Sequence, residues 1–428
     1  AGSGLDRLMK VFAWSMNALS DGKYPSADQD GRPFDSNHHP GRAALAGTLL
    51  ASGFRGVWSE FRGDWKFLKE ALHLEQHYGA NNICHRCTAT KHGRDRDLCY
   101  TIFPRTAALR KHAINPATFL ESAAAGSKPS PLLKIRDFCI SRVFFDIMHC
   151  LDLGVLQLAV PSALAELLGC NSAKAINRLD ASAIFETPGL SNTPLEMRLN
   201  NATRHYREWA KSKRHSCGTP FMRNARFTAR WVEGAYPQIT QLHAKAAELR
   251  SMQYWMRNVC VELHSKGEHG PHGKVRAELF KQLVRVDETC REGGRHLSAA
   301  ATEVLANAME RALLMYNALA ATAYDEGRLL WKTIPKHHAL THVAYDGHGT
   351  NPRAVHCYLD EDMVGRTKNI YINCHGATAP LRGLQRYLIL IGLRWHHHNR
   401  PRPIQAKVPV KFGKWRSKLR SSGRVVRT

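Results

Sequence analysis

The feature that most constrains the fold of this chain is a pair of cysteines, Cys84-x-x-Cys87, in the stretch NNICHRCTATK. Two thiolates at this spacing can both face one metal ion, so the pair can supply half of a tetrahedral zinc site. Two alternatives fit the spacing as well: a redox-active dithiol, and ordinary reduced thiols in a chain with 11 cysteines. No compact strand–helix–strand unit surrounds the pair, which disfavours a thioredoxin-like dithiol.

The best candidates for the other two zinc ligands lie far along the chain, in the stretch PKHHALTH. His338 and His342 are one helical turn apart, so on a helix both imidazoles project from the same face, and His337 is a spare. A Cys2His2 site made of Cys84, Cys87, His338 and His342 would tie two distant segments together around a structural Zn2+. The alternative is that these are surface polar residues in a chain with 24 histidines.

The charge balance favours a polyanionic partner. The chain has 61 Lys and Arg against 36 Asp and Glu, a formal net charge of +25, and nucleic acid is the leading candidate for the partner of such a surplus. The alternatives are a basic surface that serves solubility and, for the tail, a solvated end or a nuclear import signal. The residues that we expect to contact a phosphate backbone are Arg204, Arg207, Lys211, Lys213, Arg214, Lys411, Lys414, Trp415, Arg416, Lys418 and Arg420.

The sequence favours an intracellular protein, nuclear or otherwise. No run of about 18 apolar residues occurs, so no membrane span is expected. The first residues lack a basic stretch followed by an apolar core, so no signal peptide is expected. An odd number of scattered cysteines is typical of reduced thiols.

Hydrophobic periodicity predicts a chain that is mainly helical from about 153 to 333, where YPQITQLHAKAAELRSMQYWMRNVCVEL and LSAAATEVLANAMERALLMYNALAATAY carry helical spacing. Outside this region the predicted elements are a helix over 5–19, a strand ending near Asp64, a short helix from Lys66 to Gly79, a linker over 122–131, a buried strand ending near Phe145, and a helix opened by Asp360, Glu361 and Asp362.

Acidic residues flank the two halves of the predicted zinc site. Asp64 precedes the cysteine pair and Glu361 follows the histidine pair, so an ion joining the pairs would carry both carboxylates towards one region. Carboxylates are the ligands that Mg2+ and Mn2+ prefer. Two such ions can activate an attacking oxygen and stabilise the leaving one on a phosphodiester.

The order of these motifs resembles the core of DDE transposases, and most closely that of the CACTA-like group, which is related to the V(D)J recombinase catalytic core. A GD dipeptide precedes C-x-x-C; then come DIMHCLDLGV, PKHHALTH, and an acid followed by Gly and Lys. The resemblance spans roughly residues 5–370, and the order is more specific than any one motif.

The resemblance implies roles for individual residues. Asp64 matches the second catalytic acid, and Glu361, followed by Gly365 and Lys368, matches the catalytic Glu; both would hold Mg2+ or Mn2+. The zinc ligands of the family correspond to Cys84, Cys87, His338 and His342 in this chain. Asp146 and His149 match a D-x-x-H motif. We expect Asp146 to start a helix or support the site, with His149 packing beneath it, and we favour this structural role of Asp146 over the alternative of direct metal ligation.

The implied fold is mixed α/β: an RNase H-like core, incomplete at the N-terminus and interrupted by a large, mainly α-helical insertion. The expected domains are a partial core with the C-x-x-C pair (1–150), the helical insertion (151–333), the C-terminal part of the core with the His pair and the Glu (334–395), and a basic tail (396–428).

One element of the family pattern is missing. The first catalytic Asp should precede the second by a long stretch, but only Asp6, Asp21, Asp28, Asp30 and Asp35 precede Asp64, at a helix start or in turn-rich sequence. We therefore expect an N-terminally truncated copy. The intact family cleaves DNA and transfers strands; the alternative for this chain is a non-catalytic, zinc-stapled nucleic-acid-binding protein. Whether the chain forms a homo-oligomer is left open.

Overall fold

The structure of the protein is a computed structural model. It describes residues 4–92, 96–111, 114–125, 128–170, 183–190, 193–213, 221–222, 225–233, 236–240, 243–267, 272–347 and 349–398. Its contacts divide the chain into two compact units, Ala1–Tyr358 and Leu359–Thr428, which are described separately. This single division does not test the boundaries of the four domains expected from the sequence, which remain a prediction.

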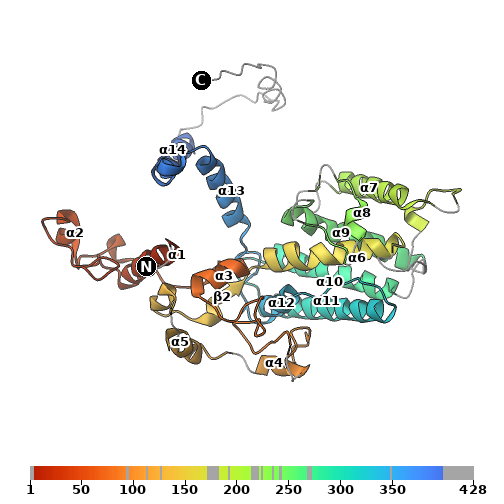
Figure 1. Ribbon diagram of the computed structural model, residues 1–428, viewed down its shortest axis with the longest axis horizontal. Coiled ribbons are helices and arrows are strands. Elements are labelled where there is room, and N and C mark those ends of the chain that lie inside the picture. The colour runs from red at the N-terminus through yellow and green to blue at the C-terminus, as the bar shows by residue number, and fades with distance from the viewer. Residues whose placement is uncertain are drawn as a thin grey trace, which may run out of the picture. The chain divides into compact units, whose positions relative to one another are not determined.

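The first unit is built around two short parallel strands and a large group of helices (Figure 1). Strand β1 (Phe61–Gly63) pairs with β2 (Val143–Phe145), with Phe61 opposite Val143 and Gly63 opposite Phe145. Both strands end where the sequence predicts. They are the only strands among the described residues, so the mixed α/β class is confirmed at this coarse level. Since the strands run parallel, Asp64 and Asp146 follow them at the same edge.

An N-terminal region packs on one side of this strand pair. Helix α1 (Gly4–Asp21) confirms the predicted first helix and contacts α3 (Trp65–Leu72) and the 3-10 turn η3 (Pro131–Lys134). Buried side chains from these elements, including Met9, Leu68 and Leu132, form a separate small core. The other short elements here are α2 (Pro40–Leu45), η1 (Ala51–Gly53), η2 (Arg96–Leu98), α4 (Ala108–Lys111), α5 (Pro116–Ala125) and η4 (Ile140–Arg142).

Two predicted boundaries in this region were wrong. Helix α3 ends at Leu72 and not at Gly79, because His73 adopts a left-handed conformation (φ 51°) that stops the helix. Its ring is fixed there by the Asp6 carboxylate and the Lys128 carbonyl, both 2.8 Å away. The predicted linker over 122–131 begins inside α5, whose run of alanines continues the helix to Ala125.

After β2 the chain winds through a π-helical segment, η5 (Met148–Val155), into α6 (Leu156–Leu167), in which every residue is buried. The stretch Met148–Leu167 is long and apolar enough to cross a membrane, but it is 100% buried in the first unit. It serves there as a core segment that contacts α9 and, through η5, α12.

The helical region predicted from the sequence consists of long antiparallel neighbours. Helix α10 (Gly273–Glu292) packs against both α9 (Ala246–Ser265) and α11 (Ala299–Asp325), as Figure 1 shows. The Ser298 hydroxyl caps α11 by accepting the Ala301 N–H at 3.2 Å. The remaining elements of the unit are η7 (Ala183–Phe185), α7 (Leu195–Ser212), α8 (Ala229–Val232) and α12 (Pro335–Tyr345).

The described part of the second unit consists of two helices and a 3-10 turn between them. Helix α13 begins at Tyr358 and runs to Ile372, followed by η8 (Gly376–Thr378) and α14 (Ala379–His398). The predicted helix at the acidic residues is confirmed, with Asp360 and Glu361 in its first turn. Gly383 of α14 is needed for the close approach, because a Cβ there would lie 2.4 Å from the Tyr371 ring.

A buried ion network joins η5 to α10 inside the first unit. Arg353 donates to Asp152 at 2.5 and 3.0 Å and lies 2.9 Å from Asp287. Both carboxylates are fully buried. Arg353 compensates the charge of both, and Arg250 also pairs with Asp287 at 2.7 Å. The Tyr358 hydroxyl also donates to Asp152 at 2.7 Å, which fixes the last residue of the unit.

Replacing this guanidinium should destabilise the first unit strongly. We expect Arg353→Met to lower the free energy of unfolding by about 3–5 kcal/mol, because it leaves two buried carboxylates without their common partner. Urea unfolding followed by circular dichroism measures the change. Lys266→Met, which removes an exposed pair with Glu262, is the control and should change stability little. Equal stability of the two variants would contradict the prediction.

Candidate metal centre and adjoining carboxylate cavity

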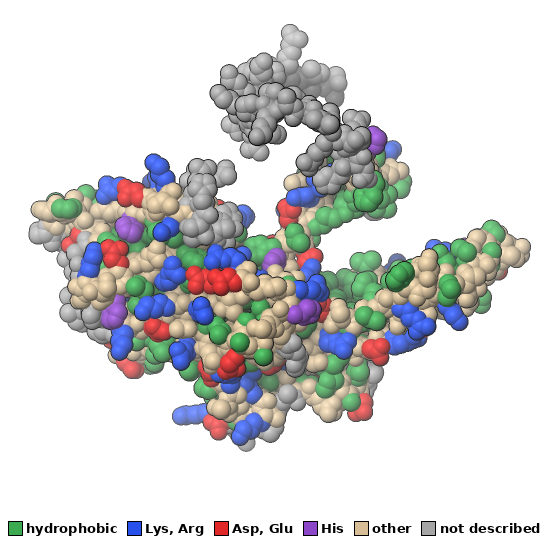
Figure 2. All heavy atoms as spheres, turned by 180° about the vertical axis from the view of Figure 1, so that it is seen from behind, with side chains coloured by type: hydrophobic (Ala, Val, Ile, Leu, Met, Phe, Trp, Pro, Cys, Tyr) green, Lys and Arg blue, Asp and Glu red, His purple; other side chains and the backbone are tan. Residues whose placement is uncertain are grey.

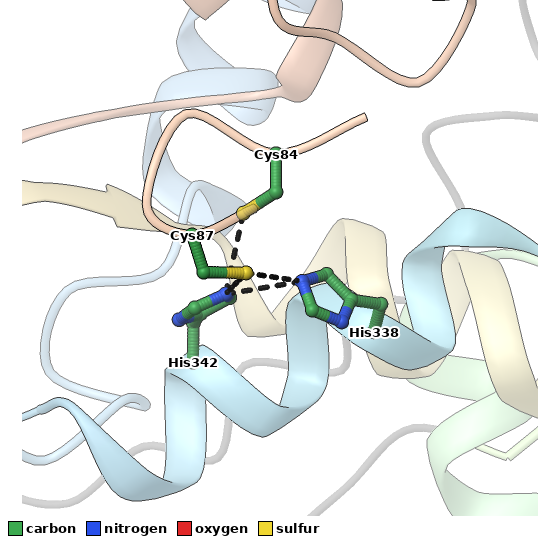
Figure 3. Close-up of side chains that lie close together, drawn as sticks. All are labelled: Cys84, Cys87, His338 and His342. Atoms are coloured by element: carbon green, nitrogen blue, oxygen red, sulfur yellow. Dashed lines mark hydrogen bonds between the residues drawn. The ribbon is translucent and has the colours of Figure 1, made fainter. Parts of the chain in front are cut away.

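Four predicted zinc ligands come together in the first unit. Cys84 and Cys87 lie in the loop after α3, and His338 and His342 lie one turn apart on α12 (Figure 3). Their ligand atoms all lie within 4.8 Å of one another, and all four residues are buried. The sequence prediction that these distant pairs meet is confirmed.

The donor set suits a tetrahedral zinc ion. The Cys84 sulfur lies 3.2 Å from His342 Nε2, and the Cys87 sulfur lies 3.3 Å from His338 Nε2. The two Nε2 atoms are 3.1 Å apart. Two sulfurs and two imidazole nitrogens that converge in a buried position are the ligands of structural zinc sites. This geometry favours the zinc alternative over a redox dithiol.

Surrounding groups orient the ligands. His342 Nδ1 lies 2.5 Å from the Asp346 carboxylate, which holds Nε2 towards the sulfurs. Asp346 lies in turn 3.7 Å from Arg86 and 3.6 Å from Arg110. Hydrogen bonding to Cys84, and then to the two histidines, lowers the pKa of Cys87, whereas burial raises the pKa of Cys84.

The spare histidine of the stretch PKHHALTH has a different role. The His337 ring packs against Tyr316, with 4.4 Å between ring centroids, and its Nδ1 lies 3.1 Å from the Ile334 carbonyl. Burial lowers the pKa of His337 to about 3, so the ring is neutral. It belongs to the core.

A cavity of about 360 Å³ lies at the edge where β1 and β2 end. The start of α12 forms part of its wall, so the helix that carries two of the zinc ligands also contributes to this cavity. The lining residues are Asp64, Trp65, Lys66, Tyr78, Lys91, Phe145, Asp146, His149, Cys150, Ile334, Pro335 and Lys336.

Asp64 is the accessible carboxylate of the cavity. It caps α3: its Oδ1 accepts the Phe67 N–H at 2.5 Å. Its Oδ2 accepts no hydrogen bond from the described part of the chain, and the residue is only half-buried. This oxygen therefore has capacity for a cation or a water molecule.

Asp146 is buried beneath the cavity and is fully hydrogen-bonded. Its Oδ1 accepts the N–H groups of Met148 and Cys357, at 3.2 and 3.1 Å. Its Oδ2 accepts the His149 N–H at 3.2 Å and lies 2.5 Å from His149 Nδ1. Burial acts to raise the pKa of Asp146, but the contact with His149 outweighs it and lowers the pKa. These contacts are those of a residue that orients His149 and starts the following helix.

Lys336 is a cavity residue that reasoning from the sequence missed. Its ammonium donates to the Leu153 carbonyl at 2.7 Å. Burial lowers its pKa, while Cys150, Asp64 and Asp146 act in the opposite direction. The sequence places Lys336 two residues before His338. This spacing alone does not show that the side chain reaches the cavity, because that depends on how α12 packs against η5.

The remaining predicted residues are not brought into this cavity by the described contacts. Glu361 lies in the second unit, and its meeting with Asp64 stays a prediction. Arg204, Arg207 and Lys211 lie on α7, and Lys213 directly follows it; all four are exposed, although Arg207 also donates to the Ala225 carbonyl. Outside the described residues are Arg214, Lys411, Lys414, Trp415, Arg416, Lys418 and Arg420.

The surface charge of the first unit is mixed. Lys and Arg side chains are spread over the face seen in Figure 2, with Asp and Glu between them. On this face the basic side chains are therefore interspersed with acidic ones.

The purified protein should contain one tightly bound zinc ion per chain. We expect Cys84→Ser or His338→Ala to lose it and to destabilise the fold by several kcal/mol, since structural zinc contributes its binding energy to folding. Plasma emission spectrometry and thermal unfolding measure the two effects. Cys139→Ser is the control, because this thiol is not part of the metal centre and its side chain forms a hydrogen bond with Ser141. Full zinc occupancy in Cys84→Ser would contradict the assignment.

The Asp346 carboxylate should tune the zinc affinity. We expect Asp346→Asn to weaken zinc binding by about 10–100-fold, because the partner that orients the His342 ring is weakened. Competition with a chromophoric chelator measures the affinity. An unchanged affinity would show that the short contact with His342 does not act on the ion.

Comparisons with known proteins leave the family open. No family model matches the chain, and neither a curated protein nor a solved structure matches it. The resemblance to DDE transposases therefore rests on the order of the motifs in the sequence, and function has to be inferred from the chemistry of the metal centre and the cavity.

Proposed function

We propose that this protein acts on DNA through metal-dependent phosphodiester cleavage and strand transfer, as DDE transposases do. One observation carries the proposal: Asp64 and Asp146 follow adjacent parallel strands and line one cavity together with Lys66, Lys91 and Lys336. Carboxylates attract the divalent ion, and ammonium groups attract the phosphate. Phosphoryl transfer requires a bound metal ion and a bound phosphate side by side.

Each group has a distinct part in this chemistry. Asp64 offers an oxygen to Mg2+ or Mn2+, which takes oxygen ligands and usually keeps several waters. Asp146 holds the His149 ring in one orientation at the edge of the cavity. Glu361 would supply a further carboxylate, as the resemblance implies.

An RNase H-like core is part of the same proposal. The parallel β1–β2 pair, with an acid at the end of each strand, would be its central portion, and the helices from α6 to α11 would be the insertion. The zinc centre would then be a structural staple that fixes α12 against the strand ends.

A second function is favoured by one specific feature. All four hydrogen-bonding positions that the Asp146 carboxylate offers are used inside the protein, which leaves Asp64 as the only accessible acid among the described cavity residues. A non-catalytic protein that binds nucleic acid through its basic residues would not need a second accessible carboxylate in the cavity. The two functions differ in whether DNA is cut.

A nicking assay separates the two. We expect the zinc-loaded protein to nick supercoiled plasmid in Mg2+ or Mn2+. We also expect Asp64→Asn to lower the rate by about 100-fold or more, because it removes a metal ligand whose contribution is several kcal/mol. Glu361→Gln should have a similar effect. Gel electrophoresis of the plasmid forms measures the rate.

Asp325→Asn is the matched control, since it neutralises an acid at the end of α11, which contributes nothing to the cavity. Nicking that survives both Asp64→Asn and Glu361→Gln would refute the assigned site. DNA binding without any nicking would favour the non-catalytic function.

A further inference from the structure

The cavity contains a lysine whose position is specified by three separate features of the fold. Lys336 lies in the first turn of α12, two residues before His338. The zinc centre fixes this helix through His338 and His342, so it also fixes the point from which the Lys336 side chain starts. The side chain then reaches the cavity that Asp64 and Asp146 line.

A glycine makes room for this lysine. A Cβ at Gly154 would lie 2.7 Å from Cδ and 3.3 Å from Cβ of Lys336, and 3.0 Å from the His149 carbonyl oxygen. Any larger residue would therefore push the aliphatic stem away or disturb η5. The residue before it, Leu153, provides the carbonyl that accepts from the ammonium at 2.7 Å. Adjacent residues of η5 thus accommodate the stem and fix its end.

The ammonium keeps hydrogen-bonding capacity for a ligand. An ammonium has three N–H donors, and the described part of the chain gives Lys336 one acceptor, the Leu153 carbonyl. Two donors remain on a group that lines the cavity. The Asp64 and Asp146 carboxylates support the charge of this half-buried ammonium, and its two remaining donors can bind an anionic ligand.

The charge of the cavity points to the same kind of ligand. Its lining includes the ammonium groups of Lys66, Lys91 and Lys336 and the carboxylates of Asp64 and Asp146. Once a divalent ion is bound at Asp64, the cavity is strongly positive. A phosphate group is the anion that such a mixture of carboxylate, metal and ammonium holds.

We propose that Lys336 is a substrate-contacting residue, which binds a non-bridging oxygen of the DNA phosphodiester in the cavity. This inference rests on the proposed function and adds a residue to it. Lysine acts in such contacts as a point charge and not as a bidentate partner. An arginine of suitable reach should therefore preserve much of the interaction, and a neutral side chain should not.

Salt-dependent DNA binding tests the contact. Fluorescence anisotropy with a labelled duplex is measured over a series of salt concentrations for wild type, Lys336→Gln, Lys336→Arg and Gly154→Ala. Lys336→Gln should weaken binding and reduce the slope of log K against log salt by about 0.9, the value for one lost phosphate contact. Lys336→Arg should restore the slope, and Gly154→Ala should resemble Lys336→Gln because the added methyl group displaces the lysine stem.

Lys332→Gln is the matched control. Lys332 is exposed one turn before Lys336 and stacks over the Tyr236 ring at 5.3 Å, so its loss should leave the slope unchanged. Zinc content is measured for every variant, because a variant that keeps its zinc has kept the metal centre. A reduced salt slope at full zinc content then indicates a lost phosphate contact, since a lysine with a purely structural role would not change the slope.

Each outcome separates this inference from the proposed function. A wild type that binds and nicks DNA, with an unchanged slope in Lys336→Gln, overturns the role of Lys336 and leaves the function standing. A reduced slope in both Lys336→Gln and Lys332→Gln shows a general charge effect and also overturns it. A wild type that neither binds nor nicks DNA removes the function and, with it, this contact.

Discussion

The position of α12 is the constraint on which the rest of the site depends. Two thiols from the loop after α3 and two imidazoles from α12 meet in one buried cluster. The sequence separation between them is 258 residues for Cys84 and His342, and closing so long a loop has a large entropic cost that a metal ion can offset. Helix α12 also packs against η5, α11 and β2, and the metal centre adds a direct connection to the loop after α3.

The strand pair supplies the second constraint. Gly63 lies opposite Phe145 in a parallel register, so the next residue on each strand, Asp64 and Asp146, emerges at one edge. The two acids nevertheless differ in their surroundings. Asp64 caps a helix with one oxygen and keeps the other accessible. Both oxygens of Asp146 form hydrogen bonds, to backbone N–H groups and to the His149 ring. Identical side chains therefore differ in what they can do: Asp64 can accept a further partner, and Asp146 supports its neighbours.

The sequence predicted those features that depend on spacing. The cysteine and histidine pairs could be matched because each has a fixed local geometry on a turn or a helix, and the strand ends at Asp64 and Phe145 follow from local apolar patterns. The ends of helices were harder to predict from the sequence. His73 stops α3 because Asp6 and Lys128 hold its ring in a left-handed conformation, and these partners come from distant parts of the chain.

Lys336 could not be predicted for a related reason. Its function depends on Gly154 and Leu153 facing the first turn of α12, and this is a matter of register between two helices that no local pattern encodes. The role of Asp146 as a support could be anticipated from the D-x-x-H spacing, but its bond to the Cys357 N–H could not. The meeting of Asp64 with Glu361 is a prediction of the same long-range kind.

The π-helical segment η5 is where these separate constraints meet. Lys336 of α12, the helix that carries His338 and His342, donates to the Leu153 carbonyl, while Arg353 and Tyr358 donate to Asp152. One link therefore leads from η5 to the metal centre, and the other leads to the residue at which α13 begins. Because π-helical turns are rare and concentrate at functional sites, a change in the winding of η5 would move both links at once. Substitutions at the two links should for this reason be non-additive, although the residues involved do not touch.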